Sequence, residues 1–410
     1  QYDKASVTFV LCSLKPFNHL EFRVNIPSCD GTLAQENTGS LTRMRERKIS
    51  EQQDSFGLTH TTVVLSFPAS VTYSATDPAD APEPVNFKPW SPEYPWLYPF
   101  TLDADSDTVD GYFAMRCYSV EPDSKGIPRF CLNHRPYFLH GILDQGYWSD
   151  GLMTAPCDEA FVYDISLAKG LGFNMLRKHI KLESLRWYYH CDRLGMIVWQ
   201  DMVNGGGKYK HWFVTYAATL MSWWKIRMRD IYPGLLARKE KEGRLEFVKE
   251  MKETVHRLKG HPSIAAWAIF NEGWGQFQTE DMTAILRKED PDRLIDQASG
   301  WFDQGGGDFC SLHNYFFKLK IHPEKKRASV LSEFGGYSYR IEGHSACGKL
   351  YGYGICRGKK ALNRRYRKRM EQVKNLIEEG LCASVYTQWS DIEEEVNGVY
   401  TYDRKIRKID

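Results

Sequence analysis

The feature that most constrains this chain is an alternation of short apolar runs and amphipathic segments that begins near residue 136. Eight runs predict strands, at 137–142, 173–178, 196–200, 264–270, 294–298, 309–315, 328–333 and 383–389. Helical periodicity between them predicts helices at 158–170, 183–194, 244–258, 277–288 and 363–379. This alternation predicts a parallel sheet covered by helices, and eight units in about 270 residues fit a (β/α)8 barrel. A doubly wound sheet is the alternative.

The residues before about 120 have a different pattern. Short β-branched or aromatic runs, separated by turn-forming residues, predict strands at 6–13, 20–26, 61–67 and 111–120. The polar segment 30–60 is predicted to be a loop. We therefore expect an α/β chain with a small all-β antiparallel sandwich over 1–120, a linker over 121–135 and a (β/α)8 TIM barrel over 136–410.

Charge and hydropathy exclude two classes of partner. The chain has 54 basic and 52 acidic residues, and this near-neutral balance argues against a dedicated nucleic-acid-binding protein. A membrane span needs a run of about 18–20 apolar residues, and the sequence has no such run. We therefore expect neither nucleic acid nor membrane as a partner.

Ten cysteines are scattered along the chain, and no two have C-x-x-C spacing. That scatter disfavours zinc and thiol-redox sites and is typical of buried thiols in a reducing compartment. We expect a cytoplasmic protein. A periplasmic or secreted location stays open, because the sequence begins at Gln1 without an initiator Met.

Polar and aromatic residues gather where the predicted barrel strands end, which is the edge that carries the active site in such barrels. Glu272 and Glu333 each directly follow or end an apolar run. Paired carboxylates across one rim are what cleavage of a glycosidic bond requires. For either glutamate alone, a salt bridge to Arg177 or Lys178 is the alternative.

The segments around these glutamates resemble one enzyme family. Residues 267–275 (WAIFNEGWG) closely resemble the acid/base motif of glycoside hydrolase family 2, which holds β-galactosidases, β-glucuronidases and β-mannosidases. Residues 331–336 (LSEFGG) resemble its nucleophile motif. Further matches occur in the expected order at 173–179, 199–201 and 386–398. The resemblance therefore covers the whole predicted barrel, and residues 1–120 are similar in position and strand pattern to the family's immunoglobulin-like middle domain, which implies an immunoglobulin-like sandwich there.

The resemblance implies a role for individual residues. Glu272 takes the place of the acid/base and Glu333 that of the nucleophile. The implied substrate-binding residues are Asn271, Arg177, His179, Asp201, Trp274, His313, Tyr315 and Trp389. Tyr315 and Arg177 are expected to lower the pKa of Glu333, whereas apolar neighbours and the charge of Glu333 are expected to raise that of Glu272.

The implied activity is that of a retaining exo-β-glycosidase acting on a terminal sugar, β-galactosidase-like. A β-glucuronidase, a β-mannosidase and a non-catalytic carbohydrate-binding barrel are the alternatives. No cofactor is expected, and no metal, because Met202 and Val203 follow Asp201 where large β-galactosidases need a second ligand. The family normally has a jelly-roll domain before the immunoglobulin-like one, and this sequence leaves no room for it before residues 1–120. Besides the glycoside, such a domain or a second copy of the chain is therefore an expected partner.

Two remaining segments are expected to be structural. The basic run 357–370 is predicted to be the solvated surface of a helix. The aromatic, amphipathic stretch 211–229 is predicted to pack against the barrel wall, with membrane contact as the alternative.

Overall fold

The computed structural model describes residues 4–15, 17, 20–24, 46–54, 58–68, 88–210, 212–224 and 226–410. The chain divides into two compact units, Gln1–Arg116 and Cys117–Asp410.

The first unit contains two small antiparallel sheets. One has the order β1-β4-β3 and the other β2-β5-β6. The strands are β1 (Lys4–Ser13), β2 (Leu20–Val24), β3 (Glu46–Gln53), β4 (Thr59–Pro68), β5 (Tyr98–Ala104) and β6 (Asp107–Phe113). The antiparallel sheets confirm the predicted all-β class of this region, and their immunoglobulin-like arrangement stays a prediction.

Strand β3 corrects the prediction that 30–60 is a loop. Its residues are polar, so periodicity did not reveal it, but they pair with β4 over the whole strand, with Ile49 opposite Val63. Backbone hydrogen bonds to a neighbouring strand override weak local preference. Residues 30–45 of the predicted loop lie outside the described part of the chain.

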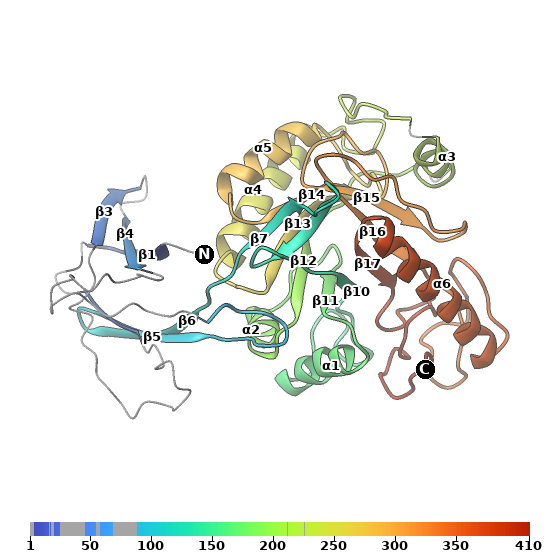
Figure 1. Ribbon diagram of the computed structural model, residues 1–410, viewed down its shortest axis with the longest axis horizontal. Helices are drawn as coiled ribbons and strands as arrows, with labels where there is room; N and C mark the ends of the chain where they lie inside the picture. The colour runs from blue at the N-terminus through green and yellow to red at the C-terminus, as the bar shows by residue number, and fades with distance from the viewer. Residues whose placement is uncertain are drawn as a thin grey trace. The chain divides into compact units, whose positions relative to one another are not determined.

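The second unit contains the predicted eight-stranded parallel barrel (Figure 1). Its strand order is β14-β13-β12-β11-β10-β17-β16-β15, and the two outer members of this order, β14 and β15, lie in contact. The strands are β10 (Leu139–Asp144), β11 (Met175–Lys178), β12 (Ile197–Asp201), β13 (Ile264–Asn271), β14 (Leu294–Ser299), β15 (Phe309–Asn314), β16 (Ala328–Gly335) and β17 (Leu381–Thr387). All eight predicted strands are present, and the barrel is confirmed over a doubly wound sheet.

Helices cover the outside of the barrel (Figure 1). They are α1 (Asp158–Gly170), α2 (Leu185–Leu194), α4 (Lys241–Leu258), α5 (Thr279–Glu289) and α6 (Lys359–Glu379), which match the five predicted helices closely. The expectation of buried thiols is met in part: Cys131, Cys191, Cys310, Cys356 and Cys382 are buried, whereas Cys12 and Cys157 are exposed. Within the described residues, no helix has the length and apolarity that crossing a membrane requires.

The aromatic stretch after β12 packs on the barrel only in part. It forms a short π-helical segment (Trp212–Ala217) followed by α3 (Ala218–Trp223). Val214 and Ala218 are buried, whereas Trp212 is 64% exposed and Tyr216 is 70% exposed. The predicted packing against the barrel wall is therefore right for one face of this segment and wrong for the other.

A third antiparallel sheet occupies the segment that was predicted to be a linker. It comprises β7 (Tyr118–Pro122), β8 (Pro128–Leu132) and β9 (Arg135–Pro136). Strand β8 contacts β16 and β17, and the Tyr118 hydroxyl donates to the carbonyl of Pro262 at 2.9 Å. Residues 121–135 are thus part of the barrel unit, because short strands with apolar residues pair and pack where a linker would stay solvated.

A buried carboxylate fixes the start of β13, the strand that leads to Glu272. Asp192 of α2 accepts from the Ser263 amide at 2.9 Å and contacts Nδ1 of His261 at 2.7 Å. The Ser263 carbonyl in turn accepts from the amide of Val198 in β12 at 2.9 Å. Asp192 is completely buried, so these contacts have no competition from solvent.

Replacing Asp192 with Ala should lower the free energy of unfolding by about 3 kcal/mol, because a buried amide then has no acceptor and a cavity remains. Denaturant unfolding monitored by fluorescence measures this change. Asp292→Ala, at an exposed position, is the matched control and should stay within about 0.5 kcal/mol of the parent. Equal stability of the two variants would contradict the role given to Asp192.

Candidate active site

A pocket of about 540 Å³ opens at the ends of the barrel strands. Loops that follow several strands supply its walls, as expected for this fold. Its lining residues are Leu143, Gln145, His179, Tyr209, Val214, Asn271, Glu272, Trp274, Trp301, Tyr315, Phe316, Glu333, Tyr351, Tyr353, Thr387 and 392–395. Both predicted catalytic glutamates lie in this pocket.

Glu272 follows the last residue of β13, and Glu333 lies near the end of β16. Glu272 has a φ of +50°, in the left-handed region that a residue with a side chain seldom adopts. Its amide donates to the carbonyl of Ser299 at 3.0 Å, which holds this turn in place. One carboxylate oxygen of Glu272 lies within 4.8 Å of one of Glu333, so the two acids share one small space.

The hydroxyl of Tyr315 bridges the two carboxyl groups. It lies 2.9 Å from Oε1 of Glu272 and 2.8 Å from Oε2 of Glu333. A phenol has one proton and can donate to one of these oxygens at a time. Both contacts are hydrogen bonds when one glutamate is protonated and donates to the phenol oxygen while the phenol donates to the other. The geometry thus suits a pair that holds one proton.

Arg177 of β11 contacts Glu333, the candidate nucleophile. Its Nε and Nη2 donate to the two carboxylate oxygens of Asp201, each at 2.9 Å. Nη2 also donates to Oδ1 of Asn271 at 2.9 Å, and Nη1 donates to Oε1 of Glu333 at 3.1 Å. A planar guanidinium with this many partners fixes their relative positions.

Burial raises the pKa of Glu272 to about 7, and the Tyr315 hydrogen bond and the Arg177 charge offset this rise in part. The predicted direction for Glu272 is therefore found. The lower pKa expected for Glu333 is not found. Burial raises the pKa of Glu333, although His313, Arg177 and Tyr315 act in the opposite direction. The predicted contacts are present, but the loss of solvation at a buried carboxylate outweighs them.

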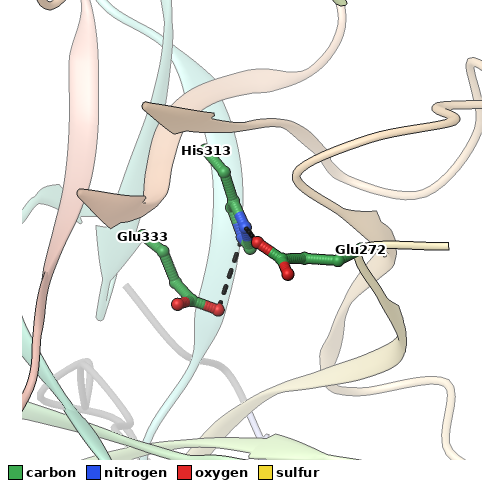
Figure 2. Close-up of side chains that lie close together, drawn as sticks. All are labelled: Glu272, His313 and Glu333. Atoms are coloured by element: carbon green, nitrogen blue, oxygen red, sulfur yellow. Dashed lines mark hydrogen bonds and ion pairs between the residues drawn. The ribbon is translucent and has the colours of Figure 1, made fainter. Parts of the chain in front are cut away.

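His313 lies between the two acids (Figure 2). Its Nδ1 is 2.8 Å from Oε1 of Glu272, and its Nε2 is 3.1 Å from the hydroxyl of Ser299 and 3.7 Å from Oε1 of Glu333. Burial lowers the pKa of His313 to about 3. The imidazole is therefore neutral at pH 7 and acts by hydrogen bonding.

The same three residues offer a metal-like set of donor atoms. Glu272, His313 and Glu333 each bring one donor within 4.8 Å of the others. The guanidinium of Arg177, 3.1 Å from Oε1 of Glu333, would repel a divalent cation there. These residues fit a hydrogen-bonded catalytic pair better than a cation site, and the expectation of no metal stays a prediction.

The structure separates the predicted site residues into two groups. Asn271, His179, Trp274 and Tyr315 line the pocket together with the two glutamates. Arg177, Asp201, His313 and Trp389 are buried and do not line this pocket. His179 lies 3.7 Å from Oε1 of Glu333. Trp389 is 2% exposed, and its ring centroid lies 5.0 Å from that of Tyr400, so the predicted contact of Trp389 with a sugar in this pocket is not supported.

Several pocket residues were not among the predicted site residues. Tyr351 and Tyr353 come from the loop between β16 and α6, where no motif marked them. The Tyr353 ring stacks on Tyr315 at 3.6 Å. Glu395 accepts from Gln388 at 3.0 Å and from Gln145 at 3.4 Å. The run of glutamates at 393–395, just after the last barrel strand, was the sequence signal for this side of the pocket.

Residues 127–326 match the TIM barrel domain of glycosyl hydrolases family 2. The matched range contains Arg177, Asp201, Glu272 and Tyr315 and ends shortly before Glu333. The barrel belongs to glycoside hydrolase family 2.

The curated relatives that match this barrel are named for activity on different sugars. A β-galactosidase of Streptococcus thermophilus is 26% identical over 220 residues, which is 52% of this chain and 19% of that protein. A β-mannosidase B of Thermothelomyces thermophilus is 30% identical over 113 residues, 28% of this chain and 10% of that protein. The chain thus spans a minor part of the length of these relatives.

Solved structures show the same fold at low identity. β-Glucuronidase 3 of Bacteroides uniformis has a TM-score of 0.64 at 14% identity and covers 99% of this chain, which spans 49% of it. A family 2 β-galacturonidase of Eisenbergiella tayi, bound to galacturonate, has a TM-score of 0.59 at 14% identity, with 88% and 70% of the two chains covered.

Proposed function

We propose that this chain is a retaining β-glycosidase in which Glu333 is the nucleophile and Glu272 the acid/base. The observation that carries the proposal is the approach of the two carboxylates within 4.8 Å of each other, with Tyr315 between them. Retaining enzymes have carboxyl groups about 5–5.5 Å apart, whereas inverting enzymes need about 6.5–9.5 Å to hold a water molecule.

The surrounding contacts support this division of roles. Arg177 and Tyr315 donate to Glu333 and so hold its carboxylate in place for attack on the anomeric carbon. Glu272 has a pKa near 7 and can carry the proton that the leaving oxygen requires. After the glycosyl–enzyme bond forms, ionised Glu272 takes a proton from water, which then releases the sugar with its configuration retained. Asn271 lines the pocket beside Glu272, where its amide can contact the sugar.

We propose a neutral terminal sugar, with galactose as the first candidate. Five glutamates line the pocket, and among the described residues no lysine or arginine does. A uronate would therefore bring its negative charge toward carboxylates without a cation to bind it, which costs free energy in a poorly solvated site. The likeness to β-glucuronidase structures concerns the fold and does not outweigh this charge distribution.

A panel of 4-nitrophenyl glycosides tests the proposal. We expect hydrolysis of the β-galactoside or the β-mannoside, with kcat/KM for the β-glucuronide at least about 100-fold lower, which corresponds to about 2.7 kcal/mol. Nuclear magnetic resonance of the first product reports the anomeric configuration. Efficient cleavage of the glucuronide would refute the neutral-sugar assignment, and binding without turnover would indicate a carbohydrate-binding barrel.

Variants of the two glutamates should differ in their dependence on the leaving group. Glu333→Gln should lower kcat by on the order of 10⁴-fold for every substrate, because an amide cannot attack the anomeric carbon. Glu272→Gln should cost on the order of 10²–10⁴-fold for alkyl glycosides and far less for activated aryl glycosides. Equal losses for both substrate types in Glu272→Gln would contradict its role as the acid.

The pH dependence follows from the raised pKa of Glu272. The acid must be protonated, so kcat/KM for an alkyl glycoside should be high below pH 7 and fall as the pH rises through about 7. Measurement of kcat/KM from pH 5 to 9 locates this decrease. Glu272→Gln has no carboxyl group to titrate at this position, so its kcat/KM should not show the decrease. A decrease that persists in this variant would have to come from another titrating group.

A further inference from the structure

A second cavity, of about 670 Å³, lies beside the catalytic pocket. Helix α6 provides one wall through Arg365, Lys368, Arg369 and Gln372, whose spacing places them on one face of the helix. Lys318, from the loop after β15, also lines the cavity, together with aromatic side chains. Part of the basic run 357–370 is therefore the wall of a cavity.

Among the described residues, the four cations of this cavity have no acidic counterpart. No aspartate or glutamate is among its described lining residues, and no carboxylate of the described chain lies within salt-bridge distance of the four. Their positive charge is available to a ligand. A cavity of several hundred Å³ with cationic and aromatic walls suits an organic anion.

Arg369 is the buried member of this set, at 8% exposure. Its guanidinium has neutral partners: the Tyr337 hydroxyl at 2.6 Å, the Phe317 carbonyl at 2.6 Å, Gln372 Oε1 at 3.1 Å and the Tyr315 carbonyl at 3.4 Å. A buried charge is costly without an opposite charge, and an anion in the cavity would supply one. The Arg365 guanidinium lies 5.4 Å from the Tyr337 ring, which orients it.

This cavity adjoins the pocket that contains Glu272 and Glu333. Tyr315, Phe316 and Tyr353 line both this cavity and the catalytic pocket. The stacked rings of Tyr315 and Tyr353 therefore form part of a shared wall, with carboxylates on the catalytic side and cations on the other. The two cavities thus adjoin at these shared aromatic side chains, so a ligand group bound in one would lie next to the other.

We propose that this cavity binds a sulfate, phosphate or carboxylate group carried by the leaving-group part of a glycoside. The assignment to the leaving group rests on the proposed glycosidase function. Anion binding by the cavity does not, so the two parts are tested separately.

Calorimetric titration with sodium sulfate, against sodium chloride at equal ionic strength, tests anion binding. We expect sulfate to bind the parent protein and the double variant Arg365→Gln/Lys368→Gln to bind it at least tenfold more weakly. Arg364→Gln is the matched control, because this exposed neighbour does not line the cavity, and it should bind sulfate like the parent. Absence of sulfate binding, or equal binding by the double variant, would overturn the anion site.

A pair of aryl β-galactosides, one neutral and one with a sulfate on the aryl ring, tests the leaving-group assignment. Binding is measured calorimetrically with Glu333→Gln protein, so the result does not depend on turnover. We expect the sulfated compound to bind at least tenfold more tightly, and the Arg365→Gln/Lys368→Gln changes to remove that difference. Equal affinities, together with sulfate binding, would identify a site for a free anion and overturn the leaving-group assignment. Failure of the proposed glycosidase activity would show separately, as absence of turnover by the parent protein.

Discussion

The site depends on the buried guanidinium of Arg177. It contacts side chains from three other strands: Asp201 of β12, Asn271 of β13 and Glu333 of β16. Removing a charge of this kind from water is costly, and the two carboxylates that flank it provide the compensation. Because guanidinium geometry is rigid, satisfying these partners fixes how far apart the strand ends lie. That arrangement also constrains the spacing between Glu333 and Glu272, the residue that follows Asn271.

The contact between Arg177 and Glu333 also gives the two glutamates different electrostatic surroundings. Both are buried, and burial raises the pKa of each. Glu333 is in direct contact with Arg177, whereas Glu272 meets the neutral groups of Tyr315 and His313. If the pair holds a single proton, that proton is therefore more stable on Glu272. The position of one cation thus gives two identical side chains different surroundings, as the proposed roles of acid and nucleophile require.

The sequence predicted this barrel well because each of its elements has a local signature. Periodicity located all eight strands, and Glu272 and Glu333 were visible because each directly follows or ends an apolar run. Strand β3 was missed because its polar residues form a strand only through pairing with β4. Trp389 was expected in the pocket, yet residues that return after the last strand cover it, with Tyr400 against its ring. Tyr353 reaches the site through a loop whose path no local pattern encodes.

The two neighbouring cavities are lined by side chains of opposite charge, and under the proposed function this difference would orient a substrate. The catalytic pocket is lined by five glutamates, and the cavity beyond Tyr315 and Tyr353 by three cationic residues of α6 and by Lys318. A glycoside with a neutral sugar and an anionic leaving group would be favoured in one direction only, since reversing it would place the anion among carboxylates. Arg369 also donates to the backbone carbonyl of Tyr315, so an anion beside it would lie next to the residue that bridges the glutamates. Orientation of the substrate and support of the catalytic pair would then depend on the same wall of aromatic side chains.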